Sequence, residues 1–145
     1  GEKIVVILGD NIATKSISQY VEKFAEQDKG ARVLLKKVGD PERYGVAALD
    51  EKRVLNIEEK PNDPQSNLAV IGYYMYDDQV YDIIKQQEPS ARGELEITDV
   101  NNQYVELGQL KADVLEGEWT DAGTHESLNY ANQILLEADN ELEIE

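Results

Sequence analysis

Short apolar runs alternate with turn-forming residues along most of the chain. Runs rich in β-branched residues predict strands over residues 3–8, 31–38, 68–76 and 110–117. Two more short strands are predicted within residues 44–61, one on either side of the polar turn Asp50–Arg53. Residues 60–67 contain two prolines and predict a loop.

Apolar residues at helical spacing predict four helices between and after these strands. Ser16 and Gln19 match a capping box for a first helix that extends to about Asp28. The other three helices are predicted to begin after Asp77, near Thr98 and after Thr124. The first helix is expected to bury Val21, Phe24 and Ala25, and the second Val80, Ile83 and Ile84. The last helix is expected to bury Leu128, Ala131, Leu135 and Ala138.

The order of these elements predicts an α/β fold. The opening strand, helix and strand, over residues 3–38, are typical of a parallel crossover unit. The later strands indicate a mixed sheet. One domain is expected over residues 1–138, followed by a frayed acidic tail at 139–145.

Charge and composition narrow the function classes. A formal net charge of −16 argues against nucleic acid and anionic membranes as partners. The acidity is explained either by a solvated surface or by adaptation to high salt. The chain has no cysteine and no apolar stretch of the roughly 18 residues that a membrane helix needs, which favours a cytoplasmic protein.

Two acidic positions follow predicted strands. Asp10, next to Asn11, ends the first strand, and Asp121 follows "EWT" just before the last helix. Ligands of open α/β sheets sit beyond strand ends, and Mg²⁺ is commonly held by one or two carboxylates plus substrate oxygens. The alternative is that these residues only shape turns or cap helices.

Other candidate residues suit a sugar phosphate. Glu59 and Lys60 lie in "EEKP", where a carboxylate can accept from hydroxyls and an ammonium can reach an anion. Arg92 offers a planar fork of donors for phosphate. An ordinary charged edge and a surface arginine are the alternatives. The lone His125, expected in an exposed first helical turn, argues against zinc sites and catalytic triads.

The order of these motifs is more specific than any one of them. "LGDN", "DPERYGVAALD", "IEEKPNDPQSNLAVIGYYMYD", "PSARGELEITDVN" and "WTDAGTHESL" together resemble the sugar-phosphate nucleotidyltransferases, closest to the thymidylyltransferase branch. The resemblance extends to about Leu136. It implies an incomplete nucleotide-diphospho-sugar transferase fold, Rossmann-like with a mixed sheet, which lacks the N-terminal nucleotide-binding βα units.

The resemblance also implies roles for residues. Asp10 and Asp121 would hold catalytic Mg²⁺, while Lys60 and Arg92 would grip the phosphate of glucose 1-phosphate. The reaction implied is attack of the sugar phosphate on dTTP, which yields dTDP-glucose and pyrophosphate. Further substrate contacts are implied at Asn11, Tyr44, Gly45, Glu59, Val70 and Tyr74.

One family feature is absent from the sequence. No glycine-rich G-x-G-x-T-R loop, which grips the triphosphate in the family, occurs anywhere in the chain. Residues 1–138 are therefore expected to form the C-terminal part of such an enzyme and to be inactive alone. Two alternatives stay open: a free-standing sugar-phosphate-binding or regulatory module, and an assembly fragment. The family resemblance also implies a homo-oligomer.

Overall fold

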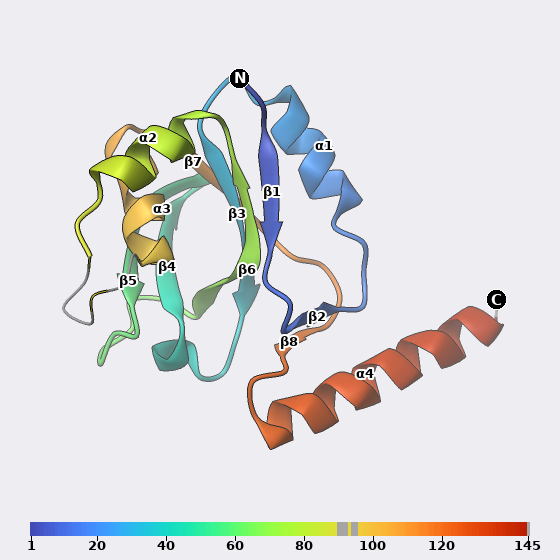
Figure 1. Ribbon diagram of the computed structural model, residues 1–145. Coiled ribbons are helices and arrows are strands. Elements are labelled where there is room, and N and C mark those ends of the chain that lie inside the picture. The colour runs from blue at the N-terminus through green and yellow to red at the C-terminus, as the bar shows by residue number, and fades with distance from the viewer. Residues whose placement is uncertain (90–92, 94–95, 145) are drawn as a thin grey trace.

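The computed structural model describes residues 1–89, 93 and 96–144, without the side chains of 141–144 (Figure 1). Each predicted strand and helix has a counterpart. In chain order the elements are β1 Ile4–Ile7, β2 Asn11–Ala13, α1 Ser18–Glu26, β3 Ala31–Lys37, the 3₁₀ turn η1 Pro41–Arg43, β4 Gly45–Asp50, β5 Arg53–Glu59, β6 Leu68–Tyr76, α2 Gln79–Gln86, α3 Ile97–Glu106, β7 Leu110–Val114, β8 Trp119–Asp121 and α4 His125–Ile144.

A six-stranded mixed sheet has the strand order β1-β6-β3-β7-β5-β4. The long strand β6 pairs with β3 on one edge. On its other edge it pairs with β1 through residues 73–76 and with β4 through residues 69 and 70. Strands β1 and β4 therefore share one edge of β6 and part from each other around Ile71 and Gly72.

The predicted parallel crossover is only partly correct. Strands β1 and β3 run in the same direction, since both are antiparallel to β6. They are not neighbours, because β6 lies between them. The apolar character of β1 and β3 did not reveal that a strand far along the chain would insert between them.

Each face of the sheet is covered by a separate apolar cluster. Helix α1 contributes Tyr20 and Phe24 to one cluster, and α2 and α3 contribute Val80, Val100 and Tyr104 to the other. Figure 1 shows α1 on one side of the sheet and α2 with α3 on the other. The side chains of β6 alternate between the two clusters, as a strand buried on both faces requires.

The first helix differs from its prediction at both ends. It begins at Ser18 without a side-chain cap, and the Ser16 hydroxyl instead accepts a hydrogen bond from the Ser18 amide. The buried positions are Tyr20 and Phe24, whereas Ala25 is exposed. The predicted capping box is therefore wrong, because the serine forms a local turn before the helix starts.

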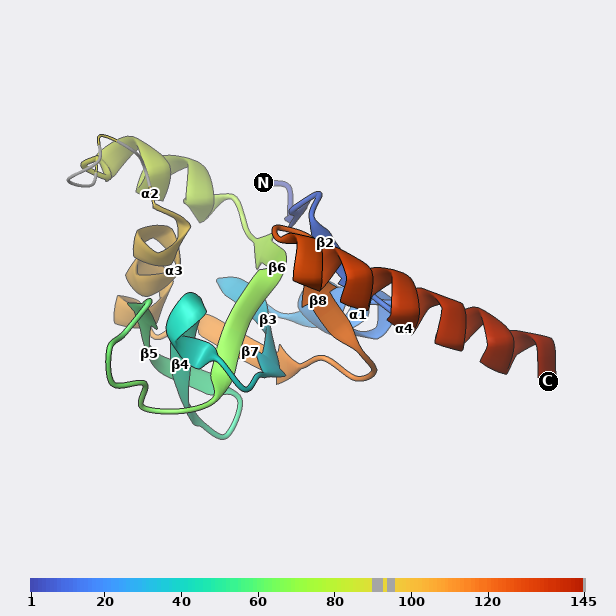
Figure 2. The same cartoon turned by 90° about the horizontal axis from the view of Figure 1, so that it is seen from below.

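Helix α4 projects from the body of the molecule (Figure 2). The Thr124 hydroxyl caps it by accepting from the Ser127 amide at 3.0 Å, as predicted. Of its apolar residues Ala131 and Ile134 are buried, while Leu128 and Leu135 are 46% and 40% exposed. The helix continues to Ile144, through the residues predicted as a frayed tail. Among the described residues, no helix combines the length and hydropathy needed to cross a bilayer.

A buried carboxylate joins β7 to its surroundings. Asp113, whose side chain is 2% exposed, forms ion pairs with Arg32 on β3, with Lys52 at 3.1 Å and with Lys23 on α1 at 3.5 Å. Burial by itself would raise the pKa of Asp113, but the hydrogen bonds from Arg32 and Lys52 outweigh it and lower the pKa below its usual value. These ion pairs connect α1 and the strands β3 and β7 through one buried carboxylate.

Replacement of Asp113 by Asn should destabilise the fold by about 3–5 kcal/mol, because Arg32 would keep a buried charge without its counterion. Urea unfolding at pH 7 measures the loss. Asp50→Asn is the matched control, since Asp50 pairs with Arg53 at 3.7 Å while both side chains are mostly exposed.

The stability difference between wild type and the Asp113→Asn variant should depend on pH. The lowered folded pKa means that Asp113 stabilises the fold above its unfolded pKa of about 3.9, and this contribution is lost as the pH falls. The stability difference between wild type and D113N should therefore narrow below about pH 4. A difference that stays constant into acid would contradict the assignment.

Candidate functional site

Two short strands bring distant parts of the chain together. Strand β2 pairs with β8, so that Asn11 lies opposite Asp121. The Ala122 amide donates to the Asp10 carbonyl at 2.7 Å. Neither strand was predicted as an element, but their pairing puts both candidate metal carboxylates at one place.

A cavity of about 200 Å³ lies beside these carboxylates, where β1 and β4 part along β6. Eight of the predicted site residues line it, namely Asp10, Asn11, Tyr44, Gly45, Glu59, Val70, Tyr74 and Asp121. Arg43, Thr98, Asn101 and Trp119 also line it and were not predicted as site residues. The cavity therefore draws on segments from the beginning, middle and end of the chain.

Asn11 fixes the end of the cavity nearest the carboxylates. Its Oδ1 accepts from the Gly72 amide at 3.0 Å and from the Trp119 indole at 2.9 Å, and its Nδ2 donates to Asp10 Oδ1 at 3.0 Å. A Cβ at Gly72 would lie 2.4 Å from Asn11 Nδ2, so only glycine allows this approach. Asn11 thus orients Asp10 through contacts that reach across three strands.

The opposite side of the cavity offers hydrogen-bonding groups of a different kind. Gly45 lies opposite Glu59 on the neighbouring strand and opposite Val70 on β6. Glu59 Oε2 accepts from the Thr98 hydroxyl at 2.5 Å. A backbone without a side chain next to a fixed carboxylate is an arrangement that can bind a polyhydroxylated ring.

Tyr74 lies between these two sides. Burial raises its pKa to about 12, with additional contributions from the charges of Glu59 and Asp10. Its ring stacks on that of Tyr76 with a centroid separation of 6.3 Å. At neutral pH the Tyr74 hydroxyl is therefore protonated and can donate to a bound ligand.

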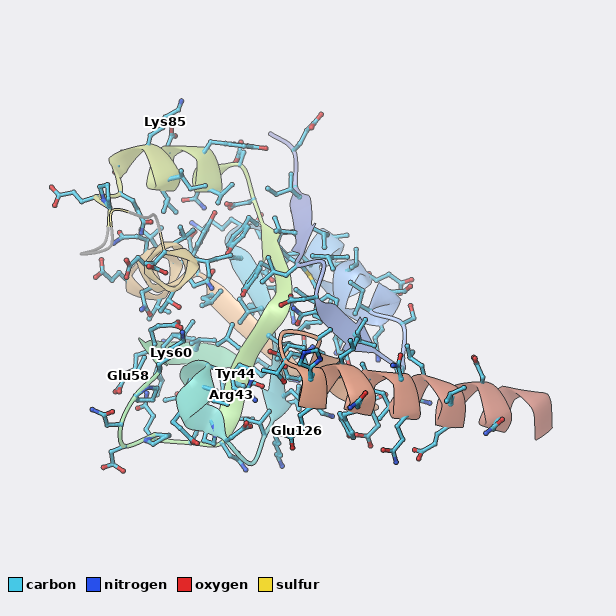
Figure 3. The ribbon with its side chains drawn as sticks, turned by 60° about the horizontal axis from the view of Figure 1, so that its bottom comes forward. Arg43, Tyr44, Glu58, Lys60, Lys85 and Glu126 are labelled. Atoms are coloured by element: carbon cyan, nitrogen blue, oxygen red, sulfur yellow. The ribbon has the colours of Figure 1, made fainter. Side chains whose placement is uncertain are left out.

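Arg43 and Tyr44 form one wall of the cavity (Figure 3). The Tyr44 ring meets Trp119 edge-on at 5.8 Å, and the Arg43 guanidinium lies 5.3 Å from the Tyr44 ring centre. Arg43 also pairs with Asp121 at 3.7 Å. The motif "PERYGV" singled out Tyr44 and Gly45, but an arginine that follows two acidic residues in a turn looks like an ordinary surface residue.

Of the predicted phosphate-binding pair, the structure describes Lys60 alone. Lys60 follows β5 with a φ of +43°, and its amide donates to the Tyr44 carbonyl at 2.9 Å. Its side chain is exposed and does not line the cavity, although Figure 3 shows it near Tyr44. Arg92 lies outside the described residues.

The acidic pair limits which metal the site suits. Within the residues that the structure describes, no group of three or more histidine, cysteine or acidic side chains is placed to hold an ion. Asp10 and Asp121 therefore offer two carboxylates at most, a donor set that fits Mg²⁺ when substrate oxygens complete its coordination. His125 is exposed at the start of α4, as predicted, and takes no part.

A family model described as Nucleotidyl transferase matches residues 1–138. The low-salt glycan biosynthesis nucleotidyltransferase Agl11 of Haloferax volcanii is 42% identical over 138 residues, which are 94% of this chain and 39% of that protein. A glucose-1-phosphate thymidylyltransferase of Neisseria meningitidis is 45% identical over 134 residues, 90% of this chain and 46% of that protein. The chain thus spans less than half the length of these relatives.

Solved structures agree on the fold. A Bacillus anthracis protein assigned as a glucose-1-phosphate thymidylyltransferase, in complex with sucrose, superposes with a TM-score of 0.86 at 53% identity. That match covers 92% of this chain and 55% of the other. A UDP-glucose pyrophosphorylase complexed with UDP-glucose gives a TM-score of 0.82 at 26% identity, over 94% and 57% of the two chains.

Replacement of Asn11 by Ala should loosen the site, because it removes the acceptor shared by the Gly72 amide and the Trp119 indole. Loss of these two bonds is expected to cost about 1–3 kcal/mol in urea unfolding. The emission of Trp119, the chain's one tryptophan, should shift to the red as its indole gains water. Asn132→Ala on the exposed side of α4 is the control and should change neither quantity.

Proposed function

Because the chain belongs to the nucleotidyl transferase family, we propose that it forms the metal- and sugar-phosphate-binding part of an enzyme that makes dTDP-glucose. The substrates proposed are glucose 1-phosphate and dTTP. One observation carries the proposal: the cavity has Asp121 on β8 and Asp10 directly before its paired strand β2 at one side, and Gly45, Glu59 and Tyr74 at the other.

The negative charge of both substrates explains why the cavity has a side with two carboxylates. Two anionic substrates must meet, and a Mg²⁺ ion held by Asp10 and Asp121 would supply the positive charge that offsets their repulsion. Asn11 keeps Asp10 oriented through the 3.0 Å bond between their side chains. The residues of the chain position groups and shape charge, which is the main work that phosphoryl-type transfer asks of a protein.

The other side of the cavity would hold the glucose ring. Glu59 accepts hydrogen bonds from sugar hydroxyls while Thr98 keeps its carboxylate in place. The missing side chain at Gly45 lets the ring approach the backbone, and Val70 lies directly opposite on β6. The protonated Tyr74 hydroxyl supplies a donor from the buried side.

Lys60 and Arg92 are proposed to bind the phosphate of glucose 1-phosphate. The Lys60 backbone is anchored to Tyr44, so its exposed ammonium can turn toward the cavity mouth when an anion arrives. In the reaction proposed, an oxygen of that phosphate attacks the α-phosphorus of dTTP. The bond from the α-phosphorus to the bridging oxygen breaks, and pyrophosphate leaves with the electron pair.

Exposed apolar surface on and around β1 favours assembly as a second candidate role. Ile7 and Leu8 are 55% and 42% exposed, and an apolar cavity of about 280 Å³ lies between β1, α2 and α3. A second copy of the chain, in a homo-oligomer, or a further polypeptide segment could cover these residues. Sedimentation over a range of concentrations tests this role, and a clean monomer at high concentration would count against it.

Binding of glucose 1-phosphate should depend on Lys60. In calorimetry with Mg²⁺ present, Lys60→Ala is expected to weaken binding about 10- to 100-fold, the usual effect of losing one charge-assisted contact. Lys85→Ala on α2 is the matched control, because it removes the same charge far from the cavity (Figure 3). Equal affinities for both variants would refute the role of Lys60.

The isolated chain should not release pyrophosphate from dTTP and glucose 1-phosphate, since it has no glycine-rich arginine loop for the triphosphate. A complete glucose-1-phosphate thymidylyltransferase serves as the positive control in the same assay. If the chain binds the sugar phosphate without turnover, the result agrees both with a part of an enzyme and with a free-standing binding module. Robust turnover by this chain would show that the loop is dispensable.

A further inference from the structure

Arg43 is held by three different groups. One guanidinium nitrogen donates to Asp40 Oδ2 at 2.8 Å, and a second lies 3.7 Å from Asp121 Oδ2. The third contact is with the face of the Tyr44 ring. Arg43 ends the 3₁₀ turn η1, where its amide donates to the Asp40 carbonyl at 3.1 Å. The backbone of Arg43 is therefore fixed, while its side chain bridges two carboxylates.

The bridge lies in a wall between two cavities. A second cavity of about 370 Å³ adjoins the first, and both are lined by Arg43, Tyr44, Trp119 and Asp121. Figure 3 shows Arg43 beside Tyr44 at the lower part of β6, and Glu126 and Ser127 in the first turn of α4 line the second cavity with it. Asp121 thus lines both cavities, and the same carboxylate that is proposed to hold the metal is paired with Arg43.

The two ion pairs of Arg43 differ in strength. The contact with Asp40 is a direct hydrogen bond of 2.8 Å, whereas the 3.7 Å contact with Asp121 is too long for one. Asp40 is therefore the anchor and Asp121 the partner that can be exchanged. In the described residues Arg43 is the one cation paired with Asp121, in a chain of net charge −16.

We propose that Arg43 holds the place of a divalent cation at Asp121, so that the guanidinium and the metal compete for this carboxylate. The inference rests on the proposed metal role of Asp121. Without metal, Arg43 offsets part of the repulsion between Asp10 and Asp121. When metal binds, the guanidinium keeps its bond to Asp40 and gives up the longer contact. The positive charge then freed faces the cavity, where a phosphate can bind it.

This arrangement makes the free site a weak metal site. A bound cation must displace Arg43 and remain near its charge, and both effects lower metal affinity. An anionic substrate that pairs with Arg43 removes the penalty. The affinity for metal is therefore expected to rise when a phosphate-bearing substrate is bound. As a result, the metal and the substrate occupy the site together.

The test measures Mn²⁺ binding to the full chain in the absence of substrate. Binding is monitored through the electron paramagnetic resonance signal of free Mn²⁺, which decreases as the ion binds. Arg43→Gln should bind Mn²⁺ about three- to tenfold more tightly than wild type. Arg53→Gln is the matched control, because Arg53 also pairs with an aspartate at 3.7 Å and lies outside both cavities. It should leave the affinity unchanged. Arg43 is 43% exposed on its side chain, so its replacement is expected to keep the fold.

A second readout uses Trp119, which contacts Arg43 through Tyr44. Mg²⁺ should change its emission in wild type and in R53Q, and the change should be smaller in R43Q. Asp121→Asn separates the two proposals. If Asp121→Asn leaves Mn²⁺ binding intact, or if no variant binds Mn²⁺, the metal site itself is wrong. If binding requires Asp121 but R43Q binds no more tightly than R53Q, the metal site stands and the competition by Arg43 is overturned.

Discussion

Strand β6 is the constraint on which the site depends, because one of its edges serves two neighbours. The pairing with β1 ends where the Leu8 amide donates to the Gly72 carbonyl, and the pairing with β4 begins at Val70 and Gly45. Between these points β1 and β4 must diverge. The backbone near Ile71 and Gly72 is thus left facing the cavity rather than a third strand, and this opening is where the carboxylates and the sugar-binding groups converge.

The parts of the fold that follow local patterns could be predicted, and the parts set by distant contacts could not. The run at residues 68–76 is long and apolar and was predicted at its observed bounds. Strands β2 and β8 have three residues each, too few to show a period of two. Their pairing depends on contacts such as that of Asn11 with Trp119, residues far apart in sequence. The insertion of β6 between β1 and β3 has the same origin.

The site shows the same division. Asp10 could be proposed from the sequence because it follows an apolar strand, and Asp121 because it lies in a turn just before a helix. The family resemblance supported both. Arg43 could not, since its significance comes from a contact with Asp121 across the fold. Lys60 was predicted as a phosphate ligand, but its side chain is exposed and does not line the cavity. A sequence gives the chemical type of a group more readily than its direction.

The double use of the β6 edge has one more consequence. Because β4 returns to β6, the strands β6, β3, β7, β5 and β4 form a closed ring, and each of them has at least two neighbours. In the described sheet only β1 has a single neighbouring strand, so the whole outer edge of β1 lies without a strand partner. This outer edge is a full-length site at which a further strand can pair with the sheet. A strand that pairs there, from whatever source, extends the sheet on the side of β1 and leaves the closed ring of strands unchanged.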